Sequence, residues 1–303
     1  GLIVAGASFI LPAAVIVLVF AWIYVRYGSL PQVAGVLYGV KPVIIAIVLQ
    51  ALWSLGRTAI KSWFLAIVGF AGIVLAFAGV HELLILLGGG VILGLGGVIL
   101  RQIRTGKPPV LFASPLVILL QTTAGSTTAF GLLPLFLFFL KVGAVLYGSG
   151  YVLLAFIRAD LVERWQWLTE SQLLDAIAVG QVTPGPVFTT ATFIGYVLGG
   201  FSGATVATLG IFLPAFVFVA LSGPLVPRIR RSPVAGAFLD GVNAASLALM
   251  FVVTYQLGRA AVIDIPAIIL AIASAIALFV FRLNSAWLIL GGAVVGFVVS
   301  ATR

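Results

Sequence analysis

Long apolar segments, separated by short stretches that hold most of the charged and turn-forming residues, dominate this chain. A bilayer-spanning helix needs roughly 20 apolar residues, and inside the membrane every backbone N–H and C=O group must be satisfied within the protein. None of the segments shows the alternating pattern of a membrane β-barrel. The sequence therefore predicts an all-α, polytopic membrane helical bundle. The candidate spans are Ile3–Tyr24, Val33–Leu55, Trp63–Val80, Leu83–Leu100, Leu132–Ile157, Leu173–Leu198, Ala204–Leu221, Val234–Leu257, Ile265–Phe281 and Trp287–Ser300.

Composition supports a membrane protein and excludes several functional classes. The 303 residues are 63% hydrophobic and only 8% charged, whereas soluble proteins carry about 25% charged residues. The net charge of +9 comes from basic residues in short loops, where they anchor orientation, so we expect no nucleic-acid partner. The chain has no cysteine and a single histidine, His81, beside Glu82. We therefore expect no disulfide, no metal site and no cofactor, and we interpret His81 as an ordinary loop residue rather than a proton relay.

An internal repeat organises the chain. A shift of 202 residues places residues 1–60 on residues 203–262 without a gap, with 18 identities in 60 pairs, against roughly a tenth expected by chance. The strongest matches are Leu-Pro-Ala at 11–13 and 213–215, and Leu-Gly-Arg at 55–57 and 257–259. We therefore predict a partial first transporter repeat over residues 1–100, a linker over 101–130 and a second repeat over 131–303.

The segment that precedes the aligned region in the second copy, Lys141–Ser202, has its counterpart before residue 1. We therefore expect the chain to be an N-terminally truncated portion of a longer protein. The excess of loop Lys and Arg changes sides between the copies, which the positive-inside rule associates with inverted-topology repeats. Such an arrangement requires an odd number of crossings between Lys107 and Gly203, and hence a broken or re-entrant element there.

A Pro-Gly-Pro sequence interrupts the apolar stretch Leu173–Leu198. Proline and glycine break a helix, and the freed backbone groups are tolerated at membrane depth only beside protein or a water-filled cavity. Pro186 can begin a helix over Val187–Leu198, whose N-terminal N–H groups and dipole would attract an anion. The alternative is a proline kink that serves helix packing. The candidate substrate-binding residues here are Gln181, Thr183, Pro184, Gly185, Pro186, Thr189, Thr190 and Thr192.

Two basic residues are further substrate-binding candidates. Lys141 lies in an apolar run, where a charge costs at least ~2.5 kcal/mol, so it faces a cavity, finds a partner or snorkels. Arg158 either reaches into the pathway or pairs within an interfacial amphipathic helix, in which Asp160 and Arg164 are spaced to pair. A second helix break lies between the two basic residues, at Gly148, Ser149 and Gly150.

Two carboxylates are candidates for proton coupling. Asp160 lies among the charges that follow Arg158, and Asp175 precedes Gln181 by about two helical turns. Asp175 is equally well explained as the pairing partner of a basic residue. The sequence leaves both alternatives open.

The Lys141–Ser202 region resembles the chromate ion transporter family. The stretches that carry the resemblance are LKVGAVLYGSGYVL, Trp167-Leu168-Thr169 and GQVTPGPVFTTATFIGY, with the Leu-Pro-Ala and Leu-Gly-Arg repeats, and it covers nearly all of residues 1–100 and 131–303. Long-chain members carry two homologous halves of opposite orientation and export chromate across the bacterial inner membrane, coupled to the proton motive force. The break at residues 148–150 departs from the glycine doublet that the resemblance leads us to expect.

We therefore expect a multi-pass inner-membrane transporter, not an enzyme, that exports chromate. The alternative on the same fold is uptake or exchange of sulfate or another oxyanion. The expected partners are such an oxyanion, the lipid bilayer and, as a candidate, a second copy in a homodimer. Two rivals are an intramembrane enzyme, which the absence of paired carboxylates or a histidine motif in a span argues against, and a structural or lipid-scrambling protein.

Overall fold

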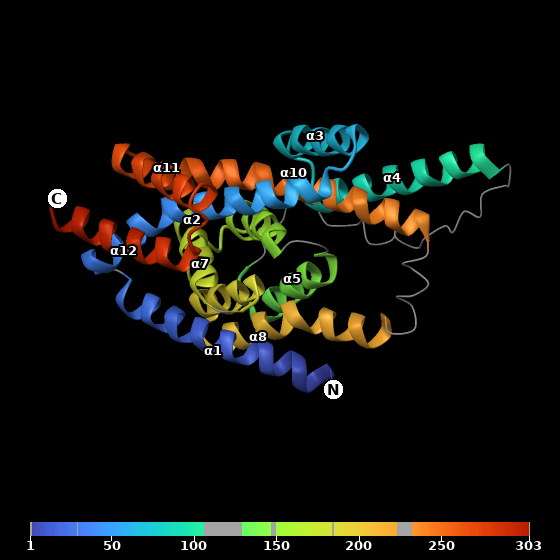
Figure 1. The fold of residues 1–303 in the computed structure, drawn as a ribbon. Coiled ribbons are helices and arrows are strands. Elements are labelled where there is room, and N and C mark those ends of the chain that lie inside the picture. Colours follow the sequence, from blue (N-terminus) through green and yellow to red (C-terminus); the bar gives the residue numbers. More distant parts are fainter. Residues whose placement is uncertain are drawn as a thin grey trace.

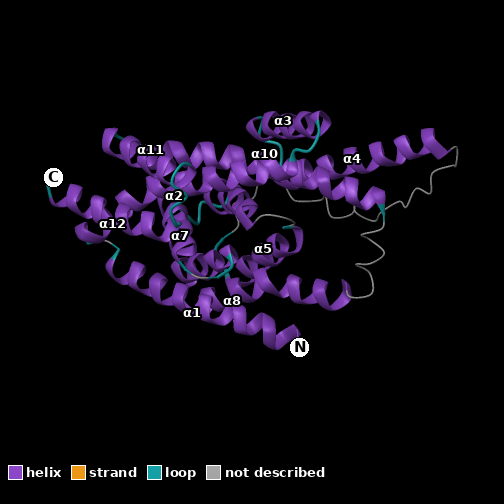
Figure 2. Ribbon diagram, viewed as in Figure 1, coloured by secondary structure: helices purple, strands orange, loops and turns teal. Residues whose placement is uncertain are grey.

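The computed structural model describes residues 2–28, 30–105, 129–146, 150–183, 185–222 and 232–302, and these are helical without strands (Figure 2). Short helical turns precede α6 (Gly150–Val152), follow it (Arg158–Arg164) and precede α8 (Val187–Thr189). The helices are α1 Leu2–Tyr27, α2 Pro31–Ala59, α3 Trp63–Phe77, α4 Glu82–Thr105, α5 Leu132–Val145, α6 Leu153–Ile157, α7 Glu170–Val182, α8 Thr190–Ser222, α10 Pro233–Ala261, α11 Ile265–Phe279 and α12 Ser285–Ala301.

Membrane-compatible helices make up most of the structure and confirm the predicted helical bundle. In the described part of the chain, four segments are long and apolar enough to cross a bilayer: Val4–Tyr27, Gln32–Ala59, Val187–Leu221 and Pro233–Ala261. Large apolar side chains cover much of the exterior, and Trp63 and Trp287 are the most exposed of them in the described residues. Such a surface suits contact with lipid, with tryptophans near its borders.

Side-chain caps define where several helices begin. The Ser62 hydroxyl accepts the Leu65 N–H at the start of α3. The Asp264 carboxylate accepts the Ala267 N–H in the same way at the start of α11. Such caps satisfy N–H groups that the first turn of a helix leaves unpaired.

The bounds of equivalent helices follow the sequence repeat. The helices α2 and α10 begin at Pro31 and Pro233, and α3 and α11 begin at Trp63 and Ile265; both pairs are offset by 202 residues. They also end with the same offset, at 59 and 261 and at 77 and 279. This agreement supports the predicted duplication, although the division into a first repeat, a linker and a second repeat stays a prediction.

The helices of the first copy (α1–α4) and those of the second copy (α5–α12) are interleaved rather than separate (Figure 1). Helix α2 packs along α12 and α11, whereas α10 packs along α4 and α3. Glycines permit the closest approaches: a Cβ at Gly39 would lie 2.0 Å from the Gly292 carbonyl oxygen, and one at Gly241 would lie 2.2 Å from that of Gly89. Helices α2 and α10 therefore take their main packing partners from the other copy, whereas α8 packs chiefly on α5 of its own copy.

The equivalent helices α2 and α10 run antiparallel. Near the start of α2, Tyr38 Oη donates to the Asp264 carboxylate, just beyond the end of α10, at 2.5 Å. Beyond the end of α2, Lys61 Nζ lies 3.4 Å from the carboxylate of Asp240, near the start of α10. Contacts at opposite ends of the two helices require opposite directions, as inverted repeats would have.

The predicted single span Leu132–Ile157 is wrong. Helix α5 ends at Val145, and the chain turns back through α6, so that Lys141 contacts Asp160 and the ring of Phe138 packs on that of Trp165. Leu146 follows the last residue of α5 in an extended conformation, and its N–H still bonds to the Val142 carbonyl. The segment forms a helical hairpin.

A second hairpin lies within α8. Gly199 and Gly200 have non-helical backbone angles, with φ of +61° at Gly200. Thr192 and Thr208 are joined by a hydrogen bond of 2.8 Å between their hydroxyls, although a straight helix would separate them by about 24 Å. Residues 190–198 therefore fold back on residues 201–222. This hairpin is a re-entrant element of the kind that inverted repeats require. Its first helical arm ends at Leu198, as predicted.

Candidate functional site

Two helix breaks that lie far apart in the sequence meet at a partly buried position, where Gly150, Val187 and Phe188 are half-buried and Gly185 is exposed. A Cβ on Gly150 would lie 3.5 Å from Val187 and 3.7 Å from Phe188, the first residues after the Pro-Gly-Pro sequence. The Pro-Gly-Pro sequence also packs closely against α1, because a Cβ on Gly185 would lie 2.3 Å from Ala13. The half-helix that begins at Val187 thus has its N-terminus beside a second interruption of the chain. This junction is where the structure concentrates irregular backbone.

Three threonine hydroxyls hold this junction in shape. Thr183 donates to the Val179 carbonyl at 2.7 Å, and Thr189 donates to the Pro186 carbonyl at 2.9 Å. Because Thr208 donates its one proton to a backbone carbonyl, Thr192 must be the donor in the bond between the two threonines. These protons are already used within the protein in this conformation.

Thr190 differs from the other three threonines. Its side chain is fully buried, and its Oγ1 has no hydrogen-bond partner in the described part of the chain. It lies against the last turn of α7, where a Cβ at Gly180 would be 2.3 Å from Thr190 Oγ1. Gln181 lies half-buried in that same turn. The predicted residues Gly148, Ser149 and Pro184 lie outside the described residues.

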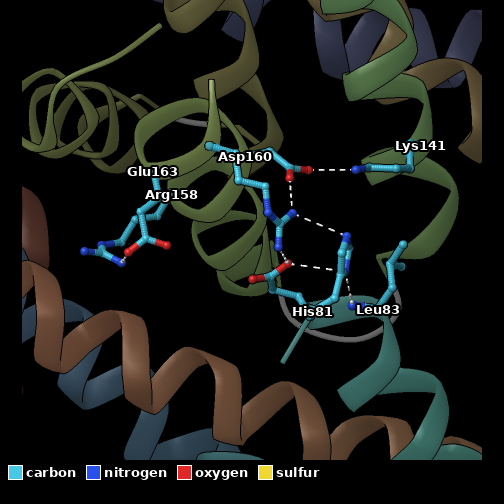
Figure 3. A network of polar contacts seen from close by, with 8 residues as sticks. His81, Leu83, Lys141, Arg158, Asp160 and Glu163 are labelled. Carbon is cyan, nitrogen blue, oxygen red and sulfur yellow. Dashed lines mark hydrogen bonds and ion pairs between the residues drawn. The ribbon is translucent and has the colours of Figure 1, made fainter. Parts of the chain in front are cut away.

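Lys141 finds a carboxylate partner. Its Nζ lies 2.7 Å from Asp160 Oδ2, and Asp160 also pairs with Arg164 (Figure 3). Asp160 is buried, whereas the Lys141 side chain is 29% exposed. Arg164 continues the network to Glu82 at the start of α4, at 3.4 Å. The network connects the hairpin of α5 and α6 to α4. Lys141 and Arg164 both pair with Asp160, which is one of the alternatives that the sequence left open.

His81 borders the same network. Its Nδ1 accepts the Leu83 N–H at 3.2 Å, and its Nε2 lies 3.3 Å from a guanidinium nitrogen of Arg164. Burial, with the positive charge of Arg164, lowers the pKa of His81 below its ordinary value. Within the described residues, no group of three or more His, Asp and Glu side chains is placed to hold a metal ion.

Arg158 contacts two carboxylates. It lies 2.5 Å from Glu163 and 2.6 Å from Glu170, at the first turn of α7. Its side chain is turned away from the Lys141 network, as Figure 3 shows for its pair with Glu163. In this conformation Arg158 joins the hairpin to α7, and the structure does not bring it together with Lys141.

Asp175 forms a buried cluster that the sequence analysis did not assemble. Its Oδ1 lies 3.2 Å from Lys41 Nζ of α2, and its Oδ2 accepts a hydrogen bond of 3.0 Å from Tyr24 of α1. Lys41 also donates to Ser171 Oγ at 2.6 Å. Lys41 could have been found by the argument applied to Lys141, because it too lies within a predicted span.

A third lysine–aspartate pair, Lys61 and Asp240, lies at the far end of α2. Here the side chains are 65% and 40% exposed, in contrast to the buried Lys41–Asp175 pair. A cavity of about 270 Å³ adjoins this pair. It is lined by Leu55, Thr58, Ala59, Lys61, Val152, Asp240, Asn243, Ser246, Leu247 and Met250.

Comparison with known proteins gives consistent matches. A protein-family model described as "Chromate transporter" matches residues 1–95 and 133–297. A "Chromate transport protein" of Cupriavidus metallidurans is 33% identical over 306 residues, covering 98% of this chain and 75% of that protein. A "Probable chromate transport protein" of Synechococcus elongatus is 30% identical, covering 88% of this chain and 68% of that protein. A "Chromate transport protein" of Pseudomonas aeruginosa is 28% identical, covering 88% and 66%. No solved structure matches the chain.

Proposed function

The chain belongs to the chromate transporter family, and on this basis we propose that it exports chromate across the inner membrane, coupled to the proton motive force. Three similar proteins bear names that refer to chromate transport. The membrane-compatible helices provide the multi-pass scaffold that such transport needs. Sulfate is the alternative substrate, because it is also a tetrahedral dianion.

The observation that supports this function most is the meeting of the two helix breaks. Gly150 lies beside Val187 and Phe188 within a bundle of apolar helices. Interrupted helices at membrane depth offer backbone N–H groups that a continuous helix does not, and the N-terminus of a half-helix attracts negative charge. Secondary transporters use this arrangement to bind anionic groups near the middle of the bilayer.

We assign the substrate donors at this junction to Thr190 and to the first N–H groups of the half-helix. Thr190 is the threonine of the predicted set whose buried hydroxyl has no partner in the described residues. Neutral donors suit transport, since the ion must also leave. Substrate binding by Lys141 and Arg158 stays a prediction and would require release from the ion pairs described above. The homodimer also stays a prediction.

Reconstituted protein tests the proposal. Liposomes containing the full chain should accumulate radiolabelled chromate when a proton gradient is imposed. Thr190→Val, which keeps the side-chain shape but removes the hydroxyl, should reduce the flux by about tenfold or more, equivalent to one lost hydrogen bond to a charged group. The matched control is Thr205→Val in α8, whose exposed hydroxyl only donates to the Phe201 carbonyl.

Each result has a separate meaning. Wild-type liposomes that move no chromate under either gradient direction would contradict the transport function. If chromate accumulates only when the proton gradient points one way across the liposome membrane, the direction of transport relative to the protons is defined. Competition by excess sulfate shows whether the substrate is chromate alone. Equal flux in Thr190→Val and wild type would remove Thr190 from the site while leaving transport in place.

A further inference from the structure

The Asp175 cluster joins three helices through side chains of opposite charge. Asp175 comes from α7, Lys41 from α2 and Tyr24 from α1. The aspartate is almost completely buried, with 3% of its side chain exposed, whereas the lysine side chain is 18% exposed. The lysine side chain is therefore the more accessible member of the pair.

The contact between the two charges is incomplete as a hydrogen bond. Asp175 Oδ1 lies 3.2 Å from Lys41 Nζ, but this buried oxygen has no hydrogen-bond partner in the described residues. The lysine directs a short hydrogen bond to Ser171 Oγ instead. Oδ1 is therefore held by the ion pair alone, and a proton could be accommodated on it without displacing Tyr24 from Oδ2.

A buried charge pair is sensitive to the loss of one partner. If a proton from water adds to Asp175, the ammonium of Lys41 is left without a counter-charge in a poorly solvated place. An anion that reaches Lys41 would restore neutrality. The carboxylate and an incoming oxyanion both present negatively charged oxygen atoms, so either can serve as the counter-charge of Lys41 in turn.

We propose that Lys41 is an oxyanion-binding residue and that the Asp175 carboxylate occupies its site until a proton neutralises it. The proposal rests on the proposed oxyanion-transport function. Because a proton and an anion that bind together move in the same direction, the device describes proton-linked oxyanion uptake, the alternative to export on the same fold. A proton and an anion then bind together, because each removes the cost that the other would face alone. Asp175 thereby acts as the competitor of the substrate, and Lys41 as its partner in both states.

The cluster is connected to the junction of the helix breaks. The ring of Tyr24 lies 5.1 Å from that of Phe193, between ring centroids, within the half-helix that follows the Pro-Gly-Pro sequence. Helix α7 leads from Asp175 to its last residue, Val182, in about two turns. The charged and titratable groups that face Asp175 in the described structure are Lys41 from α2 and Tyr24 from α1.

Equilibrium binding of radiolabelled sulfate to the purified full chain tests the proposal without requiring transport. Sulfate is the appropriate probe because it stays a dianion near neutral pH, whereas chromate itself takes up a proton there. Wild-type protein should bind sulfate at least about tenfold more tightly at about pH 5.5 than at about pH 8. Asp175→Asn should bind tightly at both pH values, because the competing charge is gone. Lys41→Gln should lose binding at both.

Two further sets of variants keep the outcome decisive. The double variant with Lys41→Gln and Asp175→Asn contains no unpaired buried charge, so it should fold, and it should not bind sulfate. Lys61→Gln and Asp240→Asn remove the exposed pair at the other end of α2 and should keep the wild-type pH dependence.

Other outcomes would overturn the proposal. Asp175→Asn with the pH dependence of wild type, or sulfate binding that survives in the folded double variant, would make the pair purely structural. Absence of sulfate binding by wild type at both pH values would also overturn it. Chromate flux in liposomes is measured separately, so flux without this binding pattern would reject the inference and leave the transport function standing.

Discussion

At the scale of single residues, charges within apolar segments are the most informative feature. Lys41 and Lys141 both lie in predicted spans, and the structure gives each a buried carboxylate partner, Asp175 and Asp160. The energetic argument that a membrane charge needs a partner holds for both. It could not name the partners, because Asp175 is 134 residues from Lys41 in the sequence. The repeat places Asn243 at the position of Lys41, so the second copy lacks the equivalent lysine.

His81 should make stability depend on pH. Its folded-state pKa lies below the ordinary value of 6.5, so protonation favours the unfolded chain. The stabilisation is complete above about pH 6.5 and is lost as the pH falls through the lowered pKa. For one proton the free energy of unfolding changes by at most about 1.4 kcal/mol per pH unit.

Thermal denaturation of detergent-solubilised protein between about pH 5 and about pH 8 measures this effect. His81→Gln should show a shallower loss of stability at the acidic end than wild type. Identical pH profiles for the two proteins would mean that His81 does not contribute.

At the scale of helices, small residues decide where the chain turns back. The sequence identified the Pro-Gly-Pro break and the helix over Val187–Leu198, since proline and glycine act locally on the backbone. It also predicted a break at Gly148, Ser149 and Gly150, but it did not show that the chain beyond this break folds back against α5, because an apolar run of 26 residues fits a span equally well. The hairpin depends on contacts such as Lys141 with Asp160, which are tertiary.

The second hairpin should be intolerant of a side chain at Gly203. A Cβ there would lie 2.1 Å from the Gly195 carbonyl oxygen, so the two arms would have to separate. We expect Gly203→Ala to lower the free energy of unfolding by about 1–3 kcal/mol, the usual cost of overpacking.

Gly56→Ala in α2 is the matched control for this substitution. A Cβ at Gly56 meets no atom within 4 Å, so this change should be neutral or stabilise by up to about 1 kcal/mol. Thermal denaturation of both variants makes the comparison, and equal stability for Gly203→Ala and Gly56→Ala would show that the arms are not in close contact.

At the scale of the whole molecule, the interleaving of the equivalent helices is the main feature. Helix α2 packs on α11 and α12, and α10 packs on α3 and α4, so these two equivalent helices exchange partners between the copies, while α5 and α8 of the second copy pack on each other. The repeat was visible in the sequence, but the exchange of partners was not, because a self-alignment says nothing about which copy packs against which. The antiparallel course of α2 and α10 supports inverted topology.

Cysteine labelling tests that topology directly, because the chain has no cysteine of its own. Lys61→Cys and Ile263→Cys are equivalent under the 202-residue shift, and both native side chains are exposed. In intact cells, a membrane-impermeant maleimide should label only one of the two variants. Permeabilised cells should show labelling of both. Labelling of both in intact cells would indicate parallel repeats.

The sequence by itself determined the membrane-embedded helical class, the repeat and its offset, and the position of the Pro-Gly-Pro break. These follow from local physics: apolar length, backbone restriction and self-similarity. Only the tertiary structure decided that the breaks near Gly150 and Pro186 meet, that Lys41 pairs with Asp175, and that the copies are interleaved. Such contacts join residues far apart in the chain and arise from packing. Hydrophobic pattern and helix propensity are local properties, so they do not predict these contacts.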